Sequence, residues 1–339
     1  CSSDLTRAGA NPHPYLLTKL HRALSTGVSG KGQLVAIVDD GFLTSHEEFS
    51  GKIIYEYGTV SPYIGSNHGT HVASIATGNY GTGDIMGVTP NADLHLTSFE
   101  RNNMGGLAAA TNDAASKGAV VQNNSWGYDY VISDAQALMT GSTTAAEAMA
   151  SVTGYDTASN WQSFIDALDN FQNGGVIVHA SANNDLGDVD ISAGLPLLAT
   201  ELQEAWISVV EAKFTVDGNH NITSASLIST PCGQAAQFCM VGDGDTKGAS
   251  DNANNAYETG WGTSYTAPQI SGGVALVAQA FPSLTPGEWR DRLLATANNN
   301  FFSGSEDGST DFGGGITHAY SDIFGHGVMD IAAALQPIG

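Results

Sequence analysis

The sequence is poor in basic residues. Only 11 of its 339 residues are Lys or Arg, against 34 Asp or Glu, so the formal net charge is -23. A surface of this sign repels other polyanions, which excludes nucleic acid as an expected partner. Charged residues make up only 13% of the chain and hydrophobic residues 42%, a balance that excludes a disordered protein.

Long apolar runs are also missing. No stretch approaches the roughly 18 to 20 consecutive apolar residues that a membrane helix needs. The first ten residues, CSSDLTRAGA, have neither the basic region nor the apolar region of a signal peptide. We therefore expect a mature form or fragment that does not cross a membrane.

Cysteine is scarce, with three residues in the chain. Cys232 and Cys239 lie seven positions apart, and a disulfide between them would stabilise the fold by roughly 2 kcal/mol; two unrelated buried thiols are the alternative. Cys1 is then unpaired and resembles the processed end of a bacterial lipoprotein, whose N-terminal cysteine carries a lipid anchor. Coincidence explains a cysteine at this position equally well.

Apolar patterns of two periods alternate along the chain. Short buried strands are indicated at 33–40, 94–99, 119–124 and 176–182, and helices at 68–78, 105–117, 157–173 and 264–281, with a capping box opening another helix at 285–289. This order predicts a single α/β domain with a mostly parallel central sheet and helices on both faces. The polar segments 128–156 and 299–323 are expected to be long surface loops.

Three short strings contain candidate catalytic residues. Asp39 ends the first strand in VAIVDDGF, where an acid can orient a histidine; Asp40 is its competitor, but alternation along a strand points the two side chains in opposite directions. His68 opens a helix in NHGTHVASIATG. With His71, one turn further on, it could instead form a metal pair or be structural.

The third string, GTSYTAPQISGG, places Ser264 directly before an apolar helix. A serine hydroxyl needs a neighbouring base to become a nucleophile, and a helix N-terminus offers N–H groups to a developing oxyanion. For an isolated serine, an N-cap is the simpler interpretation. The three strings together favour catalysis over a metal site.

In this order, VAIVDDG, HGTHVA and GTSYTAP resemble the motifs of the subtilases, the subtilisin-like serine proteases. The resemblance implies a peptidase domain over 31–339 after an N-terminal extension of residues 1–30. It implies that Ser264 attacks the peptide carbonyl, His68 transfers the proton and Asp39 orients His68. The segment 324–335 resembles the closing helix of the family.

Two more segments resemble substrate-contacting parts of subtilases. NNSWG at 123–127 implies that Ser125, Trp126 and Gly127 bind the peptide. VIVHASANND resembles the strand that ends in the oxyanion-hole asparagine, a role that falls to Asn184 when the string is aligned on its last polar residues. Asn183 then stands where the family usually has glycine, which leaves a one-residue ambiguity.

The segment 195–212, followed by the Cys232–Cys239 loop, resembles the protease passenger domains of bacterial autotransporters. Subtilases need no cofactor for their chemistry but commonly carry structural calcium, and Glu48 lies near a family ligand. The loop GNYGTGDIMG offers glycine where an amide ligand would be expected. Other acid clusters could hold a cation or be solvated loops: Asp185, Asp188 and Asp190, and Asp243 and Asp245.

We therefore expect a monomeric, secreted or surface-held bacterial serine endopeptidase that cleaves proteins or peptides through an acyl-enzyme. Two alternatives use the same scaffold. One is a surface binding protein without activity, and the other is a peptide ligase that passes the acyl group to an amine.

Overall fold

The structure, a computed structural model, describes residues 13–60, 68–82, 85–302, 304 and 306–338. Cys1, the expected lipid site, lies outside the described residues. None of the helices in the described part of the chain is long and apolar enough to cross a membrane.

One eight-stranded sheet runs through the described chain in the order β2-β3-β1-β4-β5-β6-β7, and β8 pairs with β6. Its pairings are parallel except for the antiparallel edge between β6 and β7. Two hairpins, β9–β10 and β11–β12, stand apart from it. The strands are β1 Leu34–Asp39, β2 Ile54–Tyr57, β3 Asp93–Ser98, β4 Ala119–Asn124, β5 Val176–Ala180, β6 Trp206–Val216, β7 Ile222–Leu227, β8 Cys239–Gly242, β9 Thr246–Ser250, β10 Ala256–Gly260, β11 Gly308–Asp311 and β12 Thr317–Tyr320.

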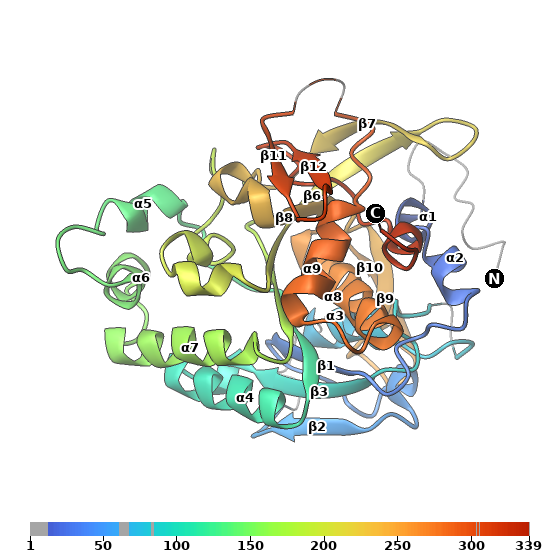
Figure 1. The fold of residues 1–339 in the computed structure, drawn as a ribbon. Coiled ribbons are helices and arrows are strands. Elements are labelled where there is room, and N and C mark those ends of the chain that lie inside the picture. The colour runs from blue at the N-terminus through green and yellow to red at the C-terminus, as the bar shows by residue number, and fades with distance from the viewer. Residues whose placement is uncertain (1–12, 61–67, 83–84, 303, 305, 339) are drawn as a thin grey trace.

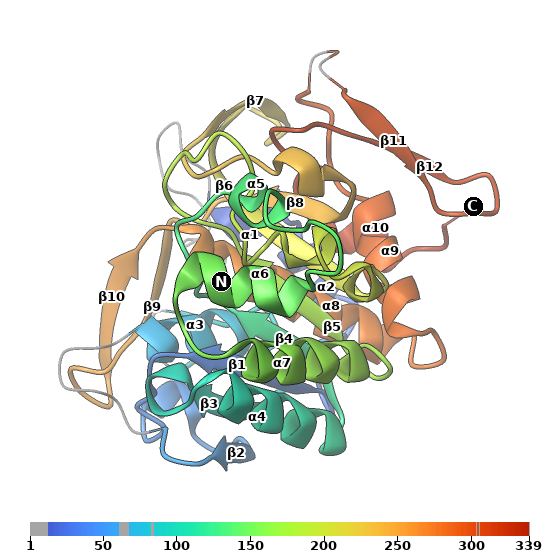
Figure 2. The same ribbon diagram turned by 90° about the vertical axis from the view of Figure 1, so that its left-hand side faces the viewer.

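Helices cover both faces of the sheet. On one face α4 and α7 lie side by side, whereas α8 packs against α3 and α9 on the other (Figures 1 and 2). The prediction of an α/β fold with a mostly parallel, two-sided sheet is confirmed. The helices are α1 Pro14–Leu17, α2 Leu20–Leu24, α3 His68–Thr77, α4 Met104–Ser116, α5 Ile132–Gln136, α6 Ala145–Thr153, α7 Ala158–Phe171, α8 Thr263–Ala280, α9 Pro286–Ala295 and α10 Ile331–Ala334.

The alternation of side chains along β1 assigns its residues to two cores. Val35 and Ile37 belong to the core that includes α3 and α8, and Leu34, Ala36 and Val38 to the core that includes α4 and α7. Successive strand side chains point to opposite faces, so Asp39 has the parity of Val35 and Ile37. The acid at the carboxyl end of β1 therefore faces the α3 and α8 side.

Both segments expected to be loops contain regular structure. The segment 128–156 includes α5 and α6, and Thr144 and Glu147 form a capping box at the start of α6 that the sequence reading missed. The segment 299–323 includes the β11–β12 hairpin. Both expectations were wrong because these elements are too short to establish a period of their own.

Three contacts other than strand pairing join segments that are separate in the chain. Cys232 and Cys239 form a disulfide, with their Cα atoms 5.9 Å apart, as the spacing predicts. Near the start of the described chain, the Tyr15 hydroxyl donates to the Met86 carbonyl at 2.7 Å, and Lys19 pairs with Asp330. The boundary at residue 30 stays a prediction.

Candidate active site

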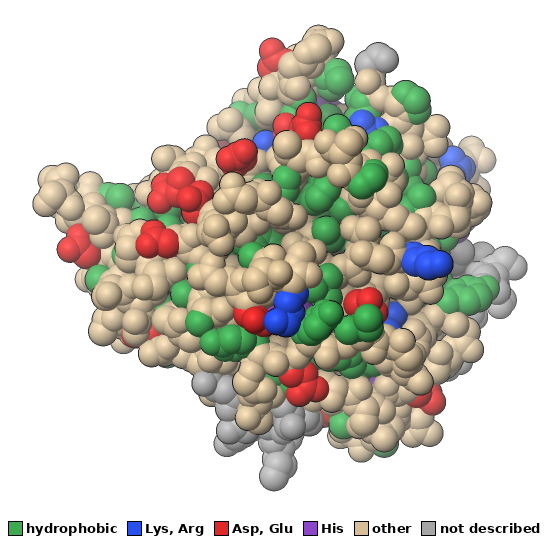
Figure 3. All heavy atoms as spheres, turned by 60° about the horizontal axis from the view of Figure 1, so that its bottom comes forward, with side chains coloured by type: hydrophobic (Ala, Val, Ile, Leu, Met, Phe, Trp, Pro, Cys, Tyr) green, Lys and Arg blue, Asp and Glu red, His purple; other side chains and the backbone are tan. Residues whose placement is uncertain are grey.

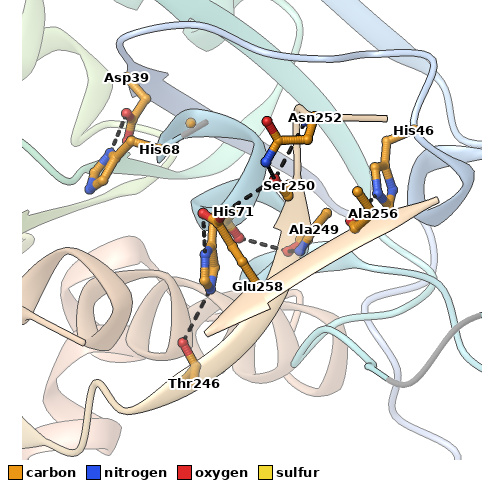
Figure 4. A network of polar contacts seen from close by, with 12 residues as sticks. Asp39, His46, His68, His71, Thr246, Ala249, Ser250, Asn252, Ala256 and Glu258 are labelled. Atoms are coloured by element: carbon orange, nitrogen blue, oxygen red, sulfur yellow. Dashed lines mark hydrogen bonds and ion pairs between the residues drawn. The ribbon is translucent and has the colours of Figure 1, made fainter. Parts of the chain in front are cut away.

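Asp39 and His68 meet at the start of α3. The distance between Asp39 Oδ1 and His68 Nδ1 is 2.6 Å, and Figure 4 shows the carboxylate and the ring turned toward each other. The Asp39 side chain is completely buried, whereas that of His68 remains 30% exposed. The carboxylate is therefore shielded from water, and the imidazole can be reached from outside.

The two groups perturb each other's proton binding. Burial raises the pKa of Asp39, because a carboxylate is disfavoured without water. Burial also lowers the pKa of His68, but the charge and hydrogen bond of Asp39 overcome it and raise that pKa to about 9. Because both pKa values are raised, a proton is held between Asp39 and His68. A histidine whose Nδ1 proton is held in this way is a strong base.

Asp40 and His71 have other roles. Asp40 Oδ1 accepts a hydrogen bond from the Gly69 amide at 3.0 Å. His71 is buried, stacks on Tyr265 with ring centroids 4.3 Å apart, and points toward the β9–β10 hairpin, away from His68 (Figure 4). Burial lowers the pKa of His71 to about 3, so this ring is neutral and structural.

Metal-ligating side chains come together at one place in the described chain. Asp39, Asp40 and His68 offer ligand atoms within 4.8 Å of one another. Asp39 Oδ1 also accepts the Asp40 amide, and Asp40 is bound to the start of α3. One oxygen of each acid is thus already engaged, whereas Asp39 Oδ2 is buried without a hydrogen-bond partner among the described residues. The short Asp39–His68 contact suits proton transfer.

Ser264 lies in the first turn of α8. Trp261–Ser264, called the serine turn below, reaches the helix through Gly262, whose φ of 135° is a backbone conformation that favours glycine. Ser264 is half-buried. Its backbone N–H is among those that a helix start leaves without a partner inside the helix, so it can face a ligand.

Pro268 changes the hydrogen bonding of this turn. Within a helix, the N–H of residue 268 would donate to the Ser264 carbonyl, but proline has no N–H. That carbonyl instead accepts from the Ser125 hydroxyl at 2.8 Å, and Ser264 Oγ donates to the Ser125 carbonyl at 3.3 Å. The start of α8 is thereby fastened to the segment that follows β4.

Tyr265 connects the serine turn with the histidine. Its ring centroid lies 5.4 Å from that of His68, and Tyr265 directly follows Ser264. The fold therefore brings the end of β1, the start of α3 and the start of α8 to one place. The catalytic roles of Asp39, His68 and Ser264 stay a prediction.

Two neighbouring asparagines differ in their contacts. Asn183 Oδ1 accepts the Thr263 amide at 2.9 Å and the Thr263 hydroxyl at 3.1 Å. Because the Thr263 N–H can only donate, the amide oxygen of Asn183 must face it and the amide NH2 must point elsewhere. Both side chains are exposed, and Asn184, the residue selected from the sequence, donates to Asp129 Oδ2 at 3.2 Å. The contacts with the serine turn favour Asn183.

The segment 125–127 adjoins the serine turn through Ser125. The Trp126 ring packs against Phe99, Phe164 and His179, and its indole N–H is buried without a hydrogen-bond partner among the described residues. Gly127 is exposed, and a Cβ there would lie 3.1 Å from Ser192 Oγ.

One of the acid clusters considered for calcium has a structural explanation. Asp190 is buried and accepts hydrogen bonds from Ser181 Oγ and from the amides of Ala182, Ser192 and Ala193. Its oxygens therefore hold a loop rather than a cation. A calcium ion elsewhere in the chain stays a prediction.

The sequence model of the subtilase family matches residues 30–327, which is most of the chain. Subtilisin DY of Bacillus licheniformis is 26% identical in an alignment that covers 85% of this chain and 92% of that protein. Fervidolysin of Fervidobacterium pennivorans is 27% identical over 91% of this chain but only 41% of its own length. The chain thus spans less than half of the length of some relatives that it matches.

Solved structures give the same fold. The crystal structure of fervidolysin, a keratinolytic enzyme related to subtilisin, matches with a TM-score of 0.66 at 19% identity, over 98% of this chain and 49% of that one. The prenylagaramide maturation protease PagA matches with a TM-score of 0.65 at 18% identity, over 93% of this chain and 96% of that one. Since the family model covers residues 30–327, this chain belongs to the subtilases, the subtilisin-like serine proteases.

Proposed function

We propose that this protein is an endopeptidase in which Ser264, His68 and Asp39 form the catalytic triad. The Asp39–His68 contact carries the proposal, because a buried carboxylate that fixes the Nδ1 proton leaves Nε2 to accept a proton from a serine. Ser264 Oγ then exchanges its long bond to the Ser125 carbonyl for one to His68. Such contacts are often loose until substrate binds.

The serine turn supplies the oxyanion site of this mechanism. The Thr263 amide holds the side chain of Asn183 beside the serine turn. The side-chain NH2 of Asn183 and the Ser264 amide would together stabilise the charge that develops on the carbonyl oxygen. The Ser125 hydroxyl donates to the Ser264 carbonyl, so the segment 125–127 lies beside the serine turn, and there Ser125, Trp126 and Gly127 would bind the peptide. The leaving amine departs on the side of His68, which returns its proton.

Asn183→Ala is expected to lower kcat by roughly 10²–10³ and to change KM little, since this bond strengthens only in the transition state. The magnitude is the one known for the oxyanion asparagine of subtilisin, a member of the same family. Asn184→Ala is the matched control and should retain most of the activity. Steady-state kinetics and melting temperatures of both variants test the assignment. A loss of kcat confined to Asn184→Ala would assign the oxyanion role to Asn184, as expected from the sequence.

The substrates proposed are proteins or peptides, with a preference for basic segments. Acidic side chains are scattered over the face drawn in Figure 3 rather than gathered in one patch. The whole chain has a net charge of -23, and a net charge of this sign attracts cationic peptides at long range. We expect kcat/KM for a basic peptide to fall more than that for a neutral peptide between about 0.01 and 1 M salt, as the Debye length shrinks from roughly 30 to 3 Å. Equal salt responses would place the charge away from the site.

We further propose that the protein acts outside the cell. The Serratia marcescens relative is named an extracellular serine protease and is 25% identical over 82% of this chain. We also propose that the protein is a monomer, that it is secreted or held at the cell surface, and that it resembles the protease domains of autotransporters. Fractionation of the native host with an antibody against the chain tests the location, and intact mass of the native protein tests a lipid on Cys1.

A further inference from the structure

A buried acid lies behind the serine turn. Glu211, on β6, is 0% exposed, and within the described chain neither of its carboxylate oxygens accepts a hydrogen bond of normal geometry. The amides of Gly262 and Gly244 nevertheless lie near enough to favour its charged form. It has the parity of Val209, which belongs to the core that includes α8. A carboxyl group carried into an apolar core at this position, without a matched partner, is costly and calls for a reason.

Two glycines bring this carboxyl group close to the serine turn. A Cβ on Gly244 would lie 2.9 Å from Glu211 Oε1 and 2.2 Å from the Gly262 carbonyl oxygen, so the loop after β8 is pressed between the acid and the turn. That Gly262 carbonyl accepts the Tyr265 amide at 2.9 Å and so starts α8. The Gly262–Thr263 peptide, which precedes Ser264, and the Glu211 carboxyl group thus lie in one tightly packed volume.

The charged groups around Glu211 do not neutralise it. Lys213 Nζ lies 3.4 Å from Asp243 Oδ1 and 3.6 Å from Asp245 Oδ2, so this cation already pairs with two other acids. Asp243 is buried as well, and its Oδ2 has no hydrogen-bond partner among the described residues. Among the other elements that contact β6, the elements β7, β8 and α8 carry no Asp, Glu, Lys, Arg or His. The ring of His179 on β5 stacks on Trp206, on the other face of β6, and Arg290 of α9 donates to the Gln203 carbonyl, before β6 begins. Within the described chain no Lys, Arg or His forms an ion pair with Glu211.

We propose that Glu211 is a positioning residue of the active site, whose ionised carboxylate holds the amides of Gly262 and Gly244 and thereby fixes the serine turn. The proposal rests on the proposed function, since it concerns how Ser264 and its amide are presented. An ionised carboxylate is a strong acceptor for backbone N–H groups, whereas the protonated acid is a weak one. Protonation of Glu211 would therefore loosen the turn.

The position of Glu211 lets this ionisation occur near neutral pH. Burial raises its pKa from 4.5 to about 7, with Asp243 adding to the rise and Lys213 and the two glycine amides opposing it. The folded protein thus binds this proton more tightly than the unfolded chain. Stability is lost as pH rises from about 4.5 to 7, while the active arrangement of the turn is gained over the upper part of this range.

The test compares wild type with Glu211→Gln, which keeps the shape and one acceptor oxygen. We expect kcat at alkaline pH to fall roughly 10-fold with KM nearly unchanged, the factor by which a bond to a charged acceptor exceeds a neutral one. The ionisation near pH 7 in the kcat profile should vanish. With Glu211 in place, Asp243→Asn should shift this ionisation to lower pH, because Asp243 raises the pKa of Glu211. Asp245→Asn changes a residue beside Lys213 as well, and this control should retain the wild-type profile and kcat.

Two readouts do not depend on peptide hydrolysis. The melting temperature of wild type should fall relative to that of Glu211→Gln between pH 4.5 and 7. The emission of Trp261, which is 63% exposed and precedes Gly262, should titrate near pH 7 in wild type and not in Glu211→Gln, with Trp261→Phe identifying its share. If wild type lacks all activity, the proposed function fails and these titrations still decide on Glu211. Unchanged profiles in Glu211→Gln, or a kcat loss that is equal at every pH with a lower melting temperature, overturn the proposal.

Discussion

Ser264→Ala is expected to abolish covalent labelling by a fluorophosphonate probe and to lower kcat by about 10⁶, the loss known for the nucleophile of subtilisin. Without the hydroxyl no acyl-enzyme can form, and the residual rate comes from the oxyanion site and substrate binding. The side chain is half-buried and loses only a 3.3 Å bond to the Ser125 carbonyl, so the melting temperature should stay unchanged. Labelling followed by intact mass, together with kinetics, measures both effects.

The control for this experiment is Ser163→Ala on the exposed face of α7, which should label like wild type. Labelling that persists in Ser264→Ala would assign the nucleophile elsewhere. A wild-type protein that does not label would favour the alternative of a binding protein on a subtilase scaffold. Capture of an added amine by the acyl-enzyme would reveal peptide ligation in place of hydrolysis.

Asp39→Asn should lower kcat by about 10⁴, because an amide can present its NH2 to Nδ1 and so leave the imidazole proton on Nε2, the atom that must accept the proton of Ser264. The pH profile should change with it. His68 is a base only when neutral, so wild-type kcat/KM rises with pH through a pKa that lies above 6.5 and toward about 9. Without the charge of Asp39, burial is the dominant effect on His68, and the pKa of this limb should move below 6.5.

Asp40→Asn is the matched control, because its amide oxygen can still accept the Gly69 N–H. It should lose far less activity than Asp39→Asn and keep a limb above 6.5. Stopped-time assays with one peptide between pH 5 and 10 measure both variants. A wild-type profile that is flat across this range would contradict His68 as the base, and equal losses in the two variants would contradict the role of Asp39.

Alternation within single elements accounts for much of what could be predicted. The run LVAIVD is short, apolar and ends in an acid, and its parity alone separates Asp39 from Asp40. The capping box at Thr285 and the apolar stripe of α7 are equally local. Each of these predictions needed only residues that are near one another in the chain.

Predictions that required distant contacts were less complete. Asn183 and Asn184 both follow β5 and have the same chemistry, and only the Thr263 amide, 80 positions away, distinguishes them. The short elements in 128–156 and 299–323 form because the rest of the fold supports them. Glu211 could have been found as an acid inside the apolar strand WISVVEAKF, but nothing in that string indicates which turn it faces.

The sequence by itself determined the α/β class and the three strings that identify the family, because periodicity and short motifs are properties of neighbouring residues. It favoured the Cys232–Cys239 disulfide over two separate thiols, and the structure decided between them. Only the tertiary structure decided which asparagine contacts the serine turn, how Ser125 takes the place of the hydrogen bond that Pro268 cannot donate, and that Glu211 lies behind Gly262. These relations join β4, β5, β6 and α8, which are far apart in the chain and meet only when the sheet is assembled. The physical reason is that hydrogen bonds and desolvation act over a few ångströms in space, whatever the separation along the sequence.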